Sequence, residues 1–141
     1  MIRGVTFGTF DLLHAGHVMF LSQCKAQCDY LTVGLHIDPH LERFEKNTPI
    51  QSVLERFIQL ESLECVNYII PYEIEKDLDF ILHFYKFDKR FLGSDYSKDY
   101  TLGKVGSQKT CKDIGTEIVF INRFHNFSST ELRNRIKEND E

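Results

Sequence analysis

Gly8-Thr9-Phe10-Asp11-Leu12-Leu13-His14-Ala15-Gly16-His17 is the stretch of sequence that decides the fold. An apolar run at residues 2–7 precedes it, and an amphipathic run that begins at Val18 follows it. This pattern predicts a strand that ends in a glycine turn and opens a helix. The first N–H groups of a helix lack partners and lie at the positive end of its dipole, so such a junction is typical of a phosphate site. The histidines at the helix start, His14 and His17, indicate chemistry on that phosphate.

The composition is that of one globular domain, which we expect to span residues 1–141. A hydrophobic content of 42% and a charged content of 27% are ordinary for a soluble protein. The formal charge of −4 argues against a nucleic-acid partner but is compatible with a small anionic ligand. We find no basic, apolar leader and no apolar run near the ~18 residues of a membrane span, so we expect a cytoplasmic protein without a membrane partner.

The four cysteines, Cys24, Cys28, Cys65 and Cys111, fall inside predicted helices or at their ends. Cys24 and Cys28 share a helix face, but the histidines nearest in sequence lie at the other end of that helix. We therefore expect buried free thiols rather than a zinc site, and no metal held by protein ligands alone. A disulfide framework is not expected in a chain of this size without a leader.

The rest of the sequence alternates between strand and helix patterns. A strand at 31–37 completes a β-α-β unit, which is the unit of a parallel sheet. Ser52 and Glu55 have the spacing of a capping box at the start of the next helix. The pattern then predicts strands at 66–70 (closed by Pro71), 90–93 and 117–121 (buried on both faces), helices at 75–85, at 108–112 and after 128–130, and a mobile polar segment at 94–106.

This order predicts an α/β fold, a single doubly wound (Rossmann-like) domain with about five parallel strands. In such sheets ligands bind beyond the carboxyl ends of the strands, where the strand order reverses. The loops expected at those ends are 8–16, 38–51, 93–95 and 123–129.

The motif at 8–17 resembles the Gly-Thr-Phe-Asp and His-x-Gly-His signature of the cytidylyltransferase-like branch of the nucleotidyltransferases. Three further segments match in register. Ser128-Ser129-Thr130 resembles that branch's Ile-Ser-Thr-Thr motif, and Arg123 matches the arginine five residues ahead of it. Residues 93–96, Gly-Ser-Asp-Tyr, are similar to its Gly-Asp-Asp-Trp or Gly-Gly-Asp-Tyr segment. In length and element order the chain is similar to the glycerol-3-phosphate cytidylyltransferases.

The resemblance implies transfer of CMP from CTP, bound with Mg²⁺, to a small phosphorylated acceptor such as a polyol or sugar phosphate, with release of pyrophosphate. The acceptor phosphate is already an anion, so no general base is needed to activate it. Catalysis then depends on positioning and on neutralising charge at the α-phosphate. His14 and His17 suit this role because an imidazole donates a hydrogen bond to a phosphate oxygen whether neutral or charged.

The resemblance also implies the nucleotide site. Its backbone cradle comprises Gly8, Thr9, Phe10 and Gly16, because a glycine lets the helix end approach the phosphates closely. The β and γ phosphates are expected to be bound by Arg123 and by the second helix start at Ser128, Ser129 and Thr130. Asp95 is expected near the base or ribose, or near the metal.

The acceptor side of the site is implied by three residues, Asp38, Lys46 and Arg56. Lys46 resembles the family's phosphate-binding lysine and is expected to act in catalysis, with Arg43 as the competing choice. Asp11 is different, because a carboxylate beside phosphates repels them unless it is otherwise engaged. We therefore expect Asp11 to be structural.

Several departures keep the substrate open. Glu64 stands where the glycerol phosphate enzymes carry an arginine, and residues 124–126 replace their Thr-Glu-Gly, with His125 facing either a substrate phosphate or solvent. The sugar-phosphate adenylyltransferases share the His-x-Gly-His motif and a Gly-Gly-Asp-Tyr segment closer to residues 93–96, so ATP is the alternative nucleotide. A non-catalytic nucleotide-binding module is the alternative from another class. The resemblance also suggests a homodimer.

Overall fold

The computed structural model describes residues 1–123 and 127–139. Its centre is a five-stranded sheet in which every neighbouring pair of strands is parallel, in the order β3-β2-β1-β4-β5. The strands are β1 (Arg3–Gly8), β2 (Tyr30–His36), β3 (Tyr68–Tyr72), β4 (Lys89–Gly93) and β5 (Glu117–Ile121). The predicted doubly wound parallel sheet is therefore confirmed.

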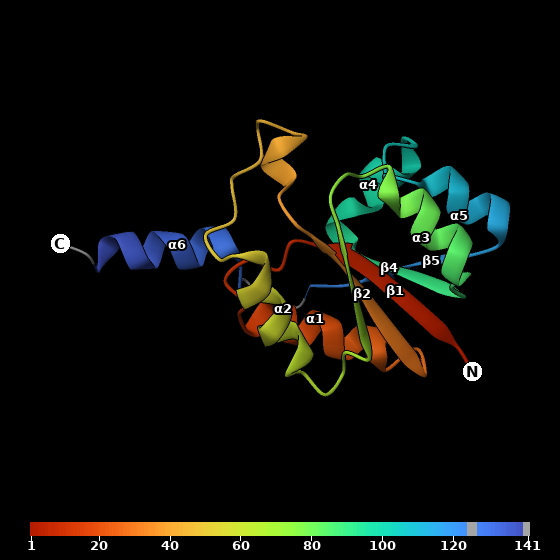
Figure 1. The fold of residues 1–141 in the computed structure, drawn as a ribbon, viewed down its shortest axis with the longest axis horizontal. Coiled ribbons are helices and arrows are strands. Elements are labelled where there is room, and N and C mark those ends of the chain that lie inside the picture. The colour runs from red at the N-terminus through yellow and green to blue at the C-terminus, as the bar shows by residue number, and fades with distance from the viewer. Residues whose placement is uncertain (124–126, 140–141) are drawn as a thin grey trace.

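Helices cover both faces of the sheet (Figure 1). The helices α1 (Ala15–Lys25) and α2 (Val53–Glu61) pack on one face around Leu21 and Leu60. The helices α3 (Asp77–Tyr85) and α5 (Gln108–Ile114) pack on the other face, where side chains of both helices join one core cluster with Val5 of β1. The last helix, α6 (Ser129–Glu138), has no buried residue and projects away from the sheet in Figure 1.

The strand order reverses between β1 and β4, and these two strands are only partly paired. Gly4 pairs with Lys89 and Val5 with Arg90, whereas β1 forms six residue pairs with β2. Beyond Val5 the Thr6 hydroxyl reaches across and donates to the Phe91 carbonyl at 3.1 Å. The carboxyl ends of β1 and β4 therefore border a crevice, which is where a doubly wound sheet binds its ligand.

Local differences from the sequence prediction have physical causes. The third strand extends through Pro71, which pairs with Leu35 instead of ending the strand. Because β3 is an edge strand, its missing N–H group faces no neighbour and costs no ladder bond. The polar segment at 94–106, which was expected to be mobile, contains a 3-10 helix, η2 (Ser94–Tyr96), and the short helix α4 (Ser97–Thr101).

The last strand was expected to be buried on both faces, and this is wrong. β5 is an edge strand in which only Ile121 is buried. Its apolar residues are mostly only partly buried. A short apolar run does not reveal whether a strand is central or at the edge of a sheet.

All four cysteines are free, and Cys24 and Cys111 are buried as expected, whereas Cys28 and Cys65 are partly exposed. Within residues 1–123 and 127–139, no group of three or more His, Cys, Asp or Glu side chains is placed to hold a metal ion. None of the helices in this part of the chain is long and apolar enough to cross a membrane.

Gly34 determines how closely β1 and β2 pack. It pairs with Phe7, and a Cβ atom at Gly34 would lie 2.2 Å from the Phe7 ring. We predict that Gly34→Ala lowers the free energy of unfolding by about 2 kcal/mol, since an overpacked core displaces its neighbours. Urea denaturation measures this. Gly106→Ala is the control, because a Cβ there meets only a Glu75 oxygen at 3.8 Å. Equal stability of the two variants would contradict the role given to Gly34.

Candidate active site

A cleft of about 610 Å³ lies at the carboxyl ends of the strands, and it includes the end of β1 and the whole of residues 90–93. This volume is in the usual range for a small-molecule site. Most of the predicted site residues line it: Gly8, Thr9, Phe10, His14, Gly16, His17, Arg123, Ser128, Ser129 and Thr130 from the catalytic and nucleotide side, and Lys46, which was expected to act in catalysis and on the acceptor side. Asp38, Arg56 and Asp95 do not line it.

His14 and His17 form a capping box at the start of α1. The Nδ1 atom of His14 accepts a hydrogen bond from the Gly16 N–H at 3.0 Å, and Nδ1 of His17 accepts one from the His14 N–H at 3.2 Å. The two rings stack with centroids 3.9 Å apart. Because each Nδ1 accepts, the proton of each neutral ring is on Nε2. The capping bonds thus leave both rings with an Nε2–H donor.

His17 is neutral at physiological pH. Burial lowers the pKa of His17 from 6.5 to about 4, with electrostatic contributions from His14 and Arg123 in the same direction and one from Asp11 opposing them. Desolvation disfavours the charged form of an imidazole, which explains the direction. A neutral His17 still donates one hydrogen bond from Nε2, so it serves a phosphate oxygen as a donor rather than as a cation.

The loop between β1 and α1 has an unusual backbone. Phe10 and Leu12 both have φ of +52°, in the left-handed region that costs a non-glycine residue about 1–2 kcal/mol. Contacts with the rest of the fold compensate this cost. The Leu12 N–H donates to the Gln51 side chain at 2.8 Å, and the Phe10 ring is buried in the core between sheet and α1. The loop is therefore held by contacts with segments far away in the sequence.

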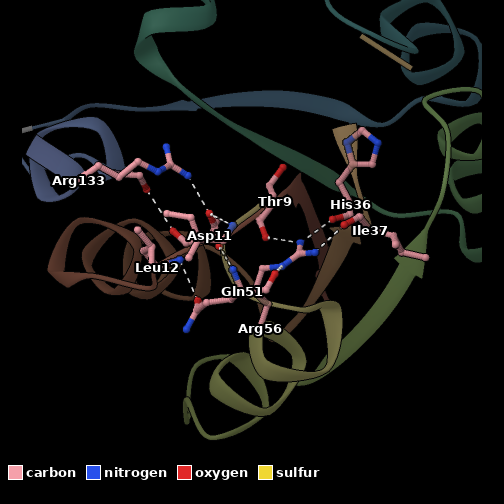
Figure 2. A network of polar contacts seen from close by, with 10 residues as sticks. Thr9, Asp11, Leu12, His36, Ile37, Gln51, Arg56 and Arg133 are labelled. Carbon is pink, nitrogen blue, oxygen red and sulfur yellow. Dashed lines mark hydrogen bonds and ion pairs between the residues drawn. The ribbon is translucent and has the colours of Figure 1, made fainter. Parts of the chain in front are cut away.

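Asp11 lies between these two residues and joins three segments (Figure 2). Its carboxylate accepts hydrogen bonds from the N–H groups of Ile50 (2.8 Å) and Gln51 (2.9 Å) and from Arg133 of α6 (2.7 Å). Burial alone would raise the pKa of Asp11, but these bonds and the Arg133 charge outweigh it and lower the pKa. The Ser129 hydroxyl donates to the Asp11 carbonyl at 3.1 Å. The expectation that Asp11 is structural agrees with this geometry.

Arg56 was expected to bind substrate, and the structure gives it a different role. Its side chain is only 2% exposed, and its guanidinium donates to the carbonyls of Gln51, Thr9, His36 and Ile37 at 2.5–3.2 Å (Figure 2). Arg56 therefore ties α2 to the ends of β1 and β2. The sequence does not distinguish a buried arginine that binds backbone from one that binds a ligand.

Asp38 also has a structural contact, because its carboxylate accepts from the His40 N–H at 3.0 Å and caps the 3-10 helix η1 (Pro39–Leu41). On the same loop Lys46 and Arg43 both line the cleft. Arg43 forms an ion pair with Glu75. His125 lies outside the described residues.

The start of α6 forms the second polar wall of the cleft. The Ser128 hydroxyl accepts from the Glu131 N–H at 3.0 Å, so Ser128 is the predicted N-cap. Arg123 lies 3.8 Å from Asp95, which follows β4, and both side chains are about half exposed. A Cβ at Gly93 would lie 2.5 Å from the Asp95 carboxylate, so any larger residue there would displace that side chain. The N-termini of α1 and α6 therefore border the same cleft, with Arg123 beside them.

Two cleft arginines were missed by sequence reasoning. Arg133 follows Ser129 by four residues, so both lie on one face of α6, and this spacing was an available signal. Arg90 is the first residue of the strand predicted at 90–93, where it precedes the apolar residues Phe91 and Leu92. A charge in such a strand is costly unless it has a purpose, and that was the signal there.

We predict that Asp11→Asn lowers the free energy of unfolding by about 2 kcal/mol at neutral pH, because charged hydrogen bonds are lost. The pKa of Asp11 is lower in the folded chain than its usual 3.8, so the stabilisation is present above that value and is lost as the pH falls through the folded pKa. Urea denaturation at several pH values should show the two proteins converging in acid. Asp113→Asn, on the exposed surface of α5, is the control. A pH-independent difference would contradict the assignment.

We also predict that the ring protons of His17 titrate in NMR spectra with a midpoint near pH 4. His17→Gln identifies the resonance by its loss. A midpoint near 6.5 would show that the ring is not desolvated, and that it is partly charged during any reaction at neutral pH.

Comparison with known proteins agrees with this geometry. The sequence profile of one family, described as cytidylyltransferase-like, matches residues 5–135. The chain is 40% identical over 101 residues to the bifunctional protein HldE of Acidiphilium cryptum. This match covers 71% of this chain and 21% of that protein. It is 34% identical over 135 residues to the HldE of Nitrobacter hamburgensis, covering 94% of this chain and 26% of that protein. The chain thus spans about a fifth to a quarter of the length of these relatives.

Solved structures show the same fold. A lipopolysaccharide core biosynthesis protein from Thermoplasma volcanium superposes with a TM-score of 0.73 and 28% identity, over 89% of this chain and 99% of that one. The pantoate–β-alanine ligase of Francisella tularensis shares the fold at a TM-score of 0.60 and 17% identity, over 97% of this chain and 70% of that one. With its motif loop at the reversal of strand order and its family profile matched nearly from end to end, this chain belongs to the cytidylyltransferase-like family.

Proposed function

We propose that this chain is a nucleotidyltransferase that transfers a nucleoside monophosphate from a nucleoside triphosphate to a small phosphorylated acceptor and releases pyrophosphate. The observation that carries this proposal is that α1, with His14 and His17, and α6, capped by Ser128, begin at one cleft. Two helix N-termini, two imidazoles and Arg123 provide N–H donors and positive charge for several phosphate groups at once.

The triphosphate would lie across both helix starts. Backbone N–H groups at the start of α6 and the Arg123 guanidinium suit the β and γ phosphates, which leave together as pyrophosphate. Lys46, from the opposite loop, adds a positive charge at the cleft. These groups stabilise charge that grows on the leaving group, which is where most of the catalytic effect in phosphoryl transfer arises.

The histidines would act on the α-phosphate. Their Nδ1 atoms are engaged in the capping box, so the rings are held in one orientation and one tautomer before substrate arrives. Each Nε2–H then donates to an oxygen whose charge increases as the acceptor oxygen attacks. The attacking phosphate oxygen is already ionised and carries no proton. His17 is therefore not needed as a general base.

Mg²⁺ would enter with the nucleotide. The described residues contain no cluster of acidic or histidine side chains that would hold the ion alone. Magnesium binds phosphate oxygens and keeps several waters, so one carboxylate beside the triphosphate is sufficient protein support. Asp95 would supply this carboxylate: it does not itself line the cleft, but it lies 3.8 Å from Arg123, which does. When bound, the ion neutralises charge on the phosphates.

For the substrates, ATP and a sugar phosphate are our first choice. The Gly93-Ser94-Asp95-Tyr96 segment is closer to that of the sugar-phosphate adenylyltransferases, and one relative is a lipopolysaccharide core biosynthesis protein. CTP with a polyol phosphate is the second candidate, which the chain's length and motif order favour. Glu64, in place of an arginine, weighs against the glycerol phosphate enzymes.

The test is pyrophosphate release from ATP, CTP, UTP and GTP with Mg²⁺ and a set of sugar and polyol phosphates. We expect acceptor-dependent release with ATP and a sugar phosphate. Release with CTP alone would replace the first choice of nucleotide by the second. A nucleotide that raises the melting temperature without any release would indicate a binding module and contradict the proposal.

Two substitutions of His17 separate capping from catalysis. In His17→Asn the side-chain amide takes the place of Nδ1, and in His17→Gln it takes the place of Nε2. We expect His17→Asn to retain the cap and most of the stability while turnover falls about 100-fold or more, as when a transition-state donor is lost. His17→Gln should retain more turnover and lose more stability. If the more stable of the two variants were also the more active one, a direct role of His17 on the phosphate would be contradicted.

A further inference from the structure

Arg90 is a buried cation in the wall of the cleft that the function proposed above does not use. Its side chain is 4% exposed, yet it lines the cleft, at the point where β1 and β4 stop pairing. The guanidinium lies over the Phe7 ring, 5.1 Å from its centroid. An arginine is charged at every physiological pH, so its burial requires compensation.

Arg90 is compensated far less well than Arg56. The Arg56 guanidinium donates to four backbone carbonyls, and its Nε is bonded to the Gln51 carbonyl. Arg90 donates from Nη1 to the Gly106 carbonyl at 2.5 Å and makes a long contact of 3.9 Å with the Cys111 sulfur. Its Nε is buried and has no hydrogen-bond partner among the described residues. The guanidinium of Arg56 is thus well supplied with hydrogen-bond acceptors, whereas that of Arg90 has a buried N–H donor without an acceptor in the described part of the chain.

No described carboxylate balances the Arg90 charge. Among residues 1–123 and 127–139 the ion pairs involve Arg43, Arg123, Arg133 and Arg135, and none reaches Arg90. Glu75, which also lines the cleft, is paired with Arg43. A purely structural arginine would be expected to have its donors filled, so this guanidinium is suited to an anion supplied from the cleft.

The surroundings of Arg90 suit a polar, hydroxylated ligand. The His36 and Tyr72 rings are stacked with centroids 4.6 Å apart, and both line the cleft. Phe7 links them to Arg90, since its ring meets the Tyr72 ring edge-on at 5.9 Å. In Figure 2, His36 lies on the far side of the view from Arg133 and α6. His36 is thus separated in this view from Arg133 of α6, one of the two helices whose starts suit the triphosphate.

We propose that Arg90 binds the phosphate of the acceptor substrate and so determines that the acceptor must be phosphorylated. The assignment rests on the proposed function for the identity of the acceptor, but the anion site itself does not. Arg90 donates from its guanidinium to the phosphate oxygens in the water-poor wall of the cleft, where a charged bond is strong. His36 and Tyr72 face the hydroxyl groups of the same molecule.

The test is binding of α-D-glucose 1-phosphate to the nucleotide-free chain, followed by the ¹⁵Nε–¹Hε resonances of the arginines. We expect the Arg90 resonance to shift with saturation, and that of Arg56, whose Nε is already bonded, to remain in place. Arg90→Gln should weaken binding of the sugar phosphate about 10-fold or more, the size expected for one charged hydrogen bond. Arg90→Lys should fall between. Unphosphorylated glucose should leave the Arg90 resonance unchanged.

Lys89→Gln is the matched control, because it removes one positive charge from the adjacent position of β4, where Lys89 donates to the Gln27 carbonyl at the surface. It should change nothing. The increase in melting temperature given by ATP or CTP reports whether the Arg90 variants retain the fold and the nucleotide site. Equal affinity of wild type and Arg90→Gln for glucose 1-phosphate, no binding by the wild type, or parallel loss of nucleotide and phosphate binding would each overturn the proposal. Phosphate binding through Arg90 without any nucleotidyl transfer would overturn the proposed function instead.

Discussion

The partial pairing of β1 with β4 is the constraint on which the site depends. Two residue pairs join these strands at their amino-terminal ends, and their carboxyl ends then border the cleft. Because the strand order reverses there, the loops after β1 and β4 leave toward opposite faces of the sheet and the space between them is not filled by a crossover. The motif loop, the Gly93 turn and the Arg90 guanidinium all border that space. The cleft is thus a consequence of topology.

A cleft of this kind can bind a ligand specifically only if the loops around it are held in place. Here two buried charged side chains hold them. Asp11 holds the motif loop to the start of α2 and to α6, while Arg56 holds α2 to the ends of β1 and β2. Both groups bind backbone or ionic partners rather than ligand. The consequence is a pair of stacked, capped imidazoles whose donors have a fixed direction, which lowers the reorganisation needed when phosphate charge develops.

Much of the fold and of the nucleotide side could be predicted because the signals are local. The strand, turn and helix around residues 8–17, the Ser52 capping box and the Ser128 cap each depend on neighbours within a few positions, and the structure has all three. The acceptor side was predicted less well. Arg56 and Asp38 were assigned to substrate but contact backbone instead, since burial and partners are set by segments distant in sequence.

By itself, the sequence determined the element order, the parallel sheet and the residues of the two helix starts, because periodicity and caps are properties of contiguous segments. Only the tertiary structure decided which charged side chains are saturated and which have donors to spare. Arg56 and Arg90 are both buried arginines, and nothing local distinguishes them. Arg56 donates to four carbonyls brought together by three chain segments. Arg90 lies where two strands stop pairing, and among the described residues it contacts the Gly106 carbonyl, the Cys111 sulfur and the face of the Phe7 ring. That difference arises from contacts between segments that are distant in the sequence and meet only in the folded chain.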